Sequence, residues 1–293
     1  MTAAPRRWPL GRFARVAVLA LLLALVYHRA LAKLAEVWRT NESYSHGPLV
    51  PIVVLALLWL RRRAIAAVPP APDARGLVLV VLACVALVAG MRADLFALEG
   101  YSLLLMVFGL AISYQGIPRL RKLAVPLGYL IFMLPFPPVI VNELSFALKE
   151  ITVRLSTTLA EQLGVLVQRN GMSLWLQGGE LRVENPCSGL RSLIALLATG
   201  ALFAIFQPGG PWRRITMFLS AIPVAMFSNV LRITLLLVVG HYLSVQQAGG
   251  RAHDWSGVVL YAASLIGLLS VRWWLSPRAR RPRTDRQPAV FAR

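Results

Sequence analysis

The feature that most constrains this chain is a succession of long apolar runs separated by short segments rich in Arg and Lys. Of its 293 residues, 57% are hydrophobic and 15% are charged, whereas soluble domains have roughly 45–50% apolar and about 25% charged residues. So many apolar runs do not fit into one water-soluble core. The sequence therefore predicts an all-α polytopic membrane protein.

We expect about eight transmembrane helices, because eight apolar runs are long enough, with their flanking residues, to cross a hydrocarbon layer of about 30 Å. The predicted spans cover residues 13–31, 47–60, 76–90, 98–114, 124–141, 188–206, 215–238 and 255–271. Residues 1–275 form one transmembrane domain in this interpretation. Residues 276–293 are rich in Pro and Arg and are predicted to form a basic, disordered tail.

The distribution of basic residues predicts how the chain is oriented in the membrane. If the N-terminus is cytoplasmic, 20 of the 31 Lys and Arg residues fall in the N-terminal segment, the cytoplasmic loops and the tail. The positive-inside rule then favours cytoplasmic N- and C-termini. The net charge of +19 is explained by this pattern, so we expect the lipid bilayer and not nucleic acid as the partner of the basic residues.

The longest outward-facing segment, residues 142–187, carries two distinct patterns. Apolar residues recur at helical spacing in its first half, which predicts an amphipathic helix on the outer membrane surface: Leu144, Leu148, Ile151, Leu155 and Leu159. The second half contains the pairs NG and GG between short apolar-rich runs. This pattern predicts a small β ribbon before the sixth span.

The stretch ENPCSGLRS places Cys187 and Ser188 where the sixth span begins. Asn185 can cap the helix and Pro186 suits its first position, so Cys187 falls in the first turn, where the helix dipole favours a thiolate. Arg191, four residues later, returns to the same face and adds positive charge. The other cysteine, Cys84, lies inside the third span, so the two do not suggest a disulfide framework.

Two further polar groups occur near the predicted outer face. Asn229 and Arg232 interrupt the seventh span, and an ionisable group within a span suggests function, although an arginine can also snorkel to the headgroups. His253, beside Asp254, precedes the last span and can act as a proton acceptor and donor. His46 and His241 are alternatives that topology does not separate from His253.

One Cys, one Arg and at least one His are the groups required for acyl transfer through a thioester. The sequence shows no metal-ligand cluster and no phosphate-binding glycine loop, so no metal or cofactor is expected. A non-enzymatic accessory of polysaccharide or protein export is the main rival interpretation. A protease that releases its product to water is another, because hydrolysis and transfer share the same acyl-enzyme.

Five motifs in order resemble the exosortase/archaeosortase family of polytopic cysteine transpeptidases: YSHGPLVP, LGYLIFMLPFPP, CSGLRS, SNVLRI and HDWSG. The resemblance covers nearly the whole chain. It implies that Cys187 is the nucleophile, Arg232 the essential arginine and His253 the base. Pro186 departs from the family, which often has a small residue before the cysteine.

The resemblance also implies what the protein acts on. Its substrates would be membrane-anchored exported proteins with a C-terminal sorting signal, composed of a short Pro-Glu-Pro-like motif, one membrane helix and a basic tail. The cleaved protein would pass to an acceptor nucleophile that the sequence does not identify. The expected location is the inner membrane, with the active site facing the periplasm.

Overall fold

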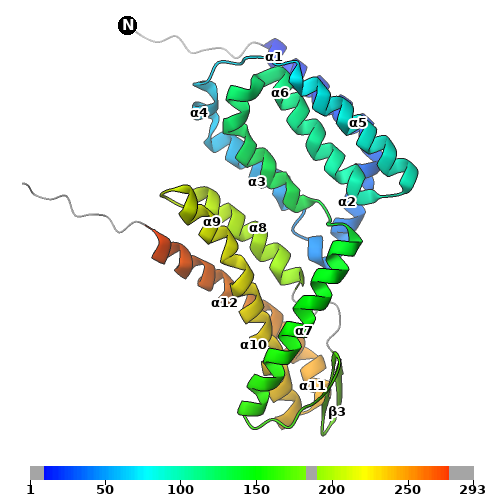
Figure 1. Ribbon diagram of the computed structural model, residues 1–293, viewed down its shortest axis with the longest axis vertical. Helices are drawn as coiled ribbons and strands as arrows, with labels where there is room; N and C mark the ends of the chain where they lie inside the picture. Colours follow the sequence, from blue (N-terminus) through cyan, green and yellow to red (C-terminus); the bar gives the residue numbers. More distant parts are fainter. Residues whose placement is uncertain (1–9, 183–189, 277–293) are drawn as a thin grey trace, which may run out of the picture.

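The computed structural model describes residues 10–182 and 190–276. These residues form a predominantly helical bundle with one small sheet (Figure 1). The helices are α1 (Leu10–Val26), α2 (His28–Thr40), α3 (Leu49–Leu60), α4 (Arg62–Ala66), α5 (Arg75–Ala93), α6 (Phe96–Gly128), α7 (Pro138–Gln162), α8 (Leu190–Phe206), α9 (Pro211–Leu219), α10 (Ala221–Tyr242), α11 (Val245–Gly249) and α12 (Arg251–Leu275), with 3₁₀ turns η1 (Glu42–Tyr44) and η2 (Tyr129–Met133). Figure 1 shows α1–α6 as one group and α8–α12 as another, with α7 running from the first group along the second.

In the described part of the chain, five helical stretches are long and apolar enough to cross a membrane: Glu42–Leu60, Arg75–Ala93, Phe96–Met133, Pro211–Tyr242 and Trp255–Leu275. A sixth is obtained if the bent pair α1 and α2 is one span, and α8 is a shorter apolar helix. The prediction of an all-α, polytopic membrane protein is therefore confirmed, whereas the count of eight spans stays a prediction.

The first predicted span differs from a single straight helix. The axes of Ala17–Val26 and His28–Thr40 differ by 77°, and the break falls at Tyr27. Tyr27 is fully buried, and its hydroxyl accepts a hydrogen bond from Ser102 Oγ at 3.2 Å. Beyond the break, Lys33 Nζ lies 3.0 Å from the buried carboxylate of Glu99. These contacts hold α2 against the start of α6 and thereby explain the bend.

Helix α6 reverses its direction at Gly116. The backbone there has φ 78° and ψ 165°, which is not helical. A Cβ built on Gly100 would lie 3.2 Å from a methyl carbon of Leu134, although a straight helix would separate residues 34 apart by about 50 Å. Residues 96–115 and 117–133 therefore form two antiparallel limbs. The start of the first limb lies beside the end of the second.

The predicted fifth span, residues 124–141, is interrupted in the structure. The helical turn η2 ends at Met133, and α7 begins at Pro138. Proline lacks a backbone N–H and disfavours helix in the residue before it, so Pro135 and Pro137 end the second limb of α6. The predicted span at residues 124–141 is therefore not one continuous helix.

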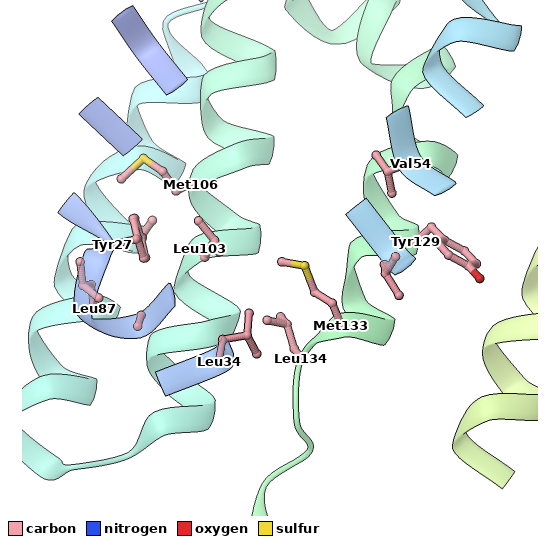
Figure 2. Packing of buried hydrophobic residues seen from close by; sticks show 12 residues of the cluster. Tyr27, Leu34, Val54, Leu87, Leu103, Met106, Tyr129, Met133 and Leu134 are labelled. Carbon is pink, nitrogen blue, oxygen red and sulfur yellow. The ribbon is translucent and has the colours of Figure 1, made fainter. Parts of the chain in front are cut away.

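The largest buried cluster joins these N-terminal helices. Tyr27 and Leu34 of the bent pair pack with Leu103 and Met106 of the first limb of α6 (Figure 2). Met133 and Leu134, at the end of the second limb, belong to the same cluster, and Leu134 lies beside Leu34 in Figure 2. The reversal at Gly116 is what brings the two ends of this hairpin into one core.

The predicted amphipathic helix is present as α7, but the face that packs against protein shares only Leu148 with the predicted apolar face among the buried residues. Thr152, Ser156 and Ala160 are buried along α10. Leu144, Ile151 and Leu155, on the predicted apolar face, are 40%, 43% and 50% exposed. Small side chains let membrane helices approach closely, which explains why this face pairs with α10. The three exposed side chains remain available to lipid, whereas Leu148 of the same predicted face is buried against protein.

The predicted β ribbon is confirmed as a three-stranded antiparallel sheet: β1 (Gln168–Asn170), β2 (Ser173–Leu176) and β3 (Gly179–Arg182). Asn170 of the NG pair ends β1, and Gly171 lies in the first turn with φ 61°. Leu174 and Leu176 on β2 are buried in a cluster with Ile233 and Leu237 of α10. The sheet is thus attached to the C-terminal half of α10.

Candidate functional site

Arg232 lies in the middle of α10 and points at the start of α12. Its Nε donates to Ser256 Oγ at 3.4 Å, slightly longer than the usual N–H···O hydrogen bond of about 2.7–3.2 Å. A Cβ built on Gly257 would lie 3.3 Å from Nη2 and 3.5 Å from Cζ of the guanidinium. Arg232 is half-buried and Ser256 is buried. The arginine is therefore packed between two helices.

His253 and Asp254 belong to the first turn of α12, although their side chains lie outside the described part of the structure. Position 253 precedes Ser256 by three residues and Gly257 by four, so all three positions share one helix face. That face meets Arg232. The helix positions of the predicted arginine and the predicted base thus converge.

Asn229 connects α10 to α7. Asn229 is buried, and its Nδ2 donates to Thr152 Oγ1 at 3.4 Å. One turn further along α7, Ser156 Oγ donates to the carbonyl oxygen of Val230 at 3.0 Å. These contacts fix the rotation of α10 about its axis, and with it the direction in which Arg232 leaves the helix.

The start of α8 follows the CSG of the cysteine motif. Cys187 and Ser188 fall in residues 183–189, outside the described part of the chain, so their predicted roles stay predictions. Arg191 is described, and its Nη1 forms an ion pair with Glu42 Oε2 in η1. The positive charge expected near the thiolate is therefore shared with a carboxylate that sequence reasoning missed.

Helix α7 contacts both α8 and α10, the helix that carries Arg232. Leu148 belongs to the same buried cluster as Leu190 of α8 and Tyr44 of η1. Thr152, one helical turn later, bonds Asn229. One turn rises 5.4 Å, so the two groups of residues occupy neighbouring levels of α7.

The other two candidate histidines have different surroundings. His46 Nε2 lies 3.2 Å from the carbonyl oxygen of Phe132, in the segment before the proline-rich break. His241 is in the last turn of α10, with its ring edge-on to Tyr242 at 4.8 Å between centroids. In the described structure, Arg232 contacts α12, the helix whose first turn contains position 253.

Several contributors to this site carry weak sequence signals. Ser256 and Gly257 are the last two residues of HDWSG, and nothing else in the sequence singles them out. The sequence gives no sign that Thr152 is buried, because a threonine on an amphipathic helix is normally predicted to face solvent. Among the described residues, no group of three or more His, Cys, Asp or Glu side chains is arranged to hold a metal ion.

The comparison with known families agrees with the motifs. Residues 38–270 match the family described as transmembrane exosortase. The chain belongs to the transmembrane exosortase family. This confirms the predicted resemblance, and the family acts on substrates that bear sorting signals. Neither the search of curated proteins nor the search of solved structures found a match.

All five motifs of this exosortase lie within the matched residues. The structure brings four of them together in two pairs. YSHG meets the proline-rich segment where the Tyr44 hydroxyl accepts from Phe136 N at 3.0 Å. SNVLRI meets HDWSG where Arg232 contacts Ser256 and Gly257. The fifth motif, CSGLRS, is described from Leu190 onward.

Proposed function

We propose that this exosortase is a membrane-embedded cysteine peptidase and transpeptidase that cleaves C-terminal sorting signals from exported proteins. The observation that carries the proposal is the contact of the Arg232 guanidinium with α12 at Ser256 and Gly257, one turn beyond position 253. This contact supports the proposal that an arginine and a histidine from separate motifs act at one reacting centre.

The proposed reaction is acyl transfer in two steps. The Cys187 thiolate attacks the carbonyl carbon of the scissile peptide bond, and a thioester forms as the C–N bond breaks. His253 takes the thiol proton and delivers it to the leaving amine. Arg232 stabilises the oxyanion or holds a substrate carboxyl group. An acceptor nucleophile then attacks the thioester, restoring the thiol.

Five residues are proposed to support these groups. Asn229 sets the orientation of α10 through Thr152. Ser188 follows Cys187 in the sequence, and Arg191 lies four residues after it, in the first turn of α8; both are proposed to support the nucleophile. Asp254 follows the proposed base in the sequence. His46 supports the proline-rich segment through its contact with the Phe132 carbonyl group.

We also propose eight membrane crossings with both termini in the cytoplasm of a cell with an inner membrane. The reversal at Gly116 supports counting two limbs in α6, and α8 supplies a further short crossing. Arg119, Arg121 and Lys122 follow that reversal directly, as the positive-inside rule requires of a cytoplasmic turn. The sheet and Arg232 then face the periplasm.

The orientation is tested by cysteine labelling in a variant without native cysteines. A cysteine at the exposed residue Gln168 should react with an impermeant reagent applied to the periplasmic side. A cysteine at the exposed residue Gly210, between α8 and α9, should be protected until the inner membrane is opened. The reverse pattern would contradict an outward-facing site.

The reaction is tested by incubating membranes with a protein that carries a C-terminal sorting signal and sequencing the new C-terminus by mass spectrometry. A C-terminus joined to an acceptor supports transpeptidation, and a carboxylic acid formed with wild-type enzyme identifies hydrolysis. Cys187→Ala at equal protein level is the control, and it should give neither product. Undiminished cleavage by Cys187→Ala would contradict the cysteine mechanism.

A further inference from the structure

The contact between Arg232 and α12 depends on the absence of a side chain at position 257. A Cβ there would lie 3.3 Å from Nη2, 3.5 Å from Cζ and 3.9 Å from Nη1. These similar distances place the planar guanidinium across the glycine. Real Cβ contacts are rarely closer than 3.4 Å, so even a single added Cβ would require the guanidinium to shift by a few tenths of an ångström, and a larger side chain would require more.

Arg232 cannot yield by moving its whole helix, because α10 is tied to α12 one turn away. Ser228 Oγ donates to the Leu260 carbonyl oxygen at 3.0 Å. Ser228 is four residues before Arg232, and Leu260 is four residues after Ser256, so this bond lies on the same two helix faces. On the opposite side, Asn229 holds α10 to α7.

Glycine is an unfavourable choice for a helix interior in every other respect. It is less favourable there than alanine, and position 257 lies in the second turn of the 25-residue helix α12. The backbone angle at Gly257 is not in the positive-φ region that requires glycine. The remaining reason for glycine is the space that the guanidinium fills.

We propose that Gly257 is a positioning residue for Arg232, and that side-chain size at position 257 sets the direction of the guanidinium. Ser256 also restrains the guanidinium, because its Oγ accepts a hydrogen bond from Arg232 Nε. The inference rests on the proposed function, because it concerns an arginine that acts on the substrate. It goes further by assigning the HDWSG motif a second task besides supplying a histidine.

The first test is a size series at this position, with rates of sorting-signal cleavage measured in membranes. In Gly257→Ala the group must shift by a few tenths of an ångström, and kcat should fall about 3- to 10-fold with KM nearly unchanged. In Gly257→Val the shift approaches 1 Å, and kcat should fall about 100-fold. Gly267→Ala on the same helix is the control, because its Cβ would meet Val224 at an ordinary 3.5 Å.

Two outcomes separate positioning from general damage to the helix. Gly257→Ala should not lower thermal stability, since alanine favours helix more than glycine does. In an Arg232→Lys background, Gly257→Ala should change cleavage less than twofold, because the broad planar group is gone. Full additivity of the two losses, or an unchanged rate in Gly257→Val, would overturn the inference.

A readout without catalysis keeps this test independent of the proposed reaction. Phenylglyoxal modifies arginine, and peptide mapping gives the modification rate of Arg232 in purified protein. Gly257→Val should raise that rate severalfold, while exposed Arg154 serves as an internal reference. Equal Arg232 rates in both proteins would refute the positioning role, whereas absent cleavage by wild-type protein would refute the proposed function alone.

Discussion

Replacing Gly116 with alanine should destabilise the protein strongly, because the reversal of α6 depends on this residue. With φ 78° and ψ 165°, Gly116 occupies a region that is almost restricted to glycine. A Cβ at this position would lie 1.8 Å from the carbonyl oxygen of Ala71. Both the backbone angle and the neighbouring loop therefore oppose any side chain.

The expected magnitude follows from three contributions. Backbone strain in this region costs about 1–3 kcal/mol. Moving the loop at Ala71 away costs about 1–3 kcal/mol of overpacking. The Ala71 N–H bond to the Gln115 carbonyl oxygen, 3.1 Å long, is then lost at about 0.5–1.5 kcal/mol. The total is about 2.5–7.5 kcal/mol, a large fraction of the stability of a typical domain.

The assay is thermal unfolding of purified protein in mild detergent, together with the folded yield. Gly128→Ala is the matched control in the same helix: Gly128 has φ −62° and nothing would lie within 4 Å of its Cβ. That control should be neutral or stabilising by up to about 1 kcal/mol. Equal stability of the two variants would refute the reversal at Gly116 and the two-limb description of α6.

Two further predictions concern the chemistry, and both are measured as cleavage rates at equal protein level. Cys187→Ala should abolish processing while membrane insertion is retained, whereas Cys84→Ala, in α5, should be nearly silent; comparable losses would exclude Cys187 as the sole nucleophile. Arg232→Lys should lose about 10²–10³ in rate, because lysine lacks the planar fork that binds an oxyanion. Arg191→Lys should be milder, since a lysine can keep its charge beside Glu42; near-normal cleavage by Arg232→Lys would leave that arginine only a role in snorkelling.

The sequence predicted those features that repeat or that depend on local chemistry. Long apolar runs identified the membrane class, and the NG and GG pairs identified the ribbon, because each signal is contained in a few neighbouring residues. The polar face of α7 was misjudged, because a bilayer reverses the usual pattern. Leucines can face lipid there, whereas Thr152, Ser156 and Ala160 allow close helix packing.

Features that depend on residues distant in sequence were not predictable in this way. Gly116 gave no sign of a reversal, because the decisive contact is with Ala71 in a preceding loop. The ion pair between Glu42 and Arg191 joins residues 149 positions apart. Motif order placed Arg232 and His253 in one predicted site, but it did not show which face of α12 contacts Arg232. Ser256 and Gly257 show that face.

The first motif and the proline-rich motif of this exosortase form one structural unit. Where prolines interrupt the helix, backbone atoms lose their helical partners, and in a membrane those atoms require other partners. Trp38 Nε1 donates to the Met133 carbonyl oxygen at 3.0 Å, and His46 Nε2 lies 3.2 Å from that of Phe132. The Tyr44 hydroxyl accepts from Phe136 N.

This arrangement gives YSHG a task that requires no catalysis. Gly47 completes it, because a Cβ there would lie 2.1 Å from Trp38 Nε1 and would displace the indole. The irregular segment held in this way leads directly into α7, whose next turns contact α8 and Asn229. The proline break thus fixes the position of α7, and α7 fixes the rotation of the helix that carries Arg232.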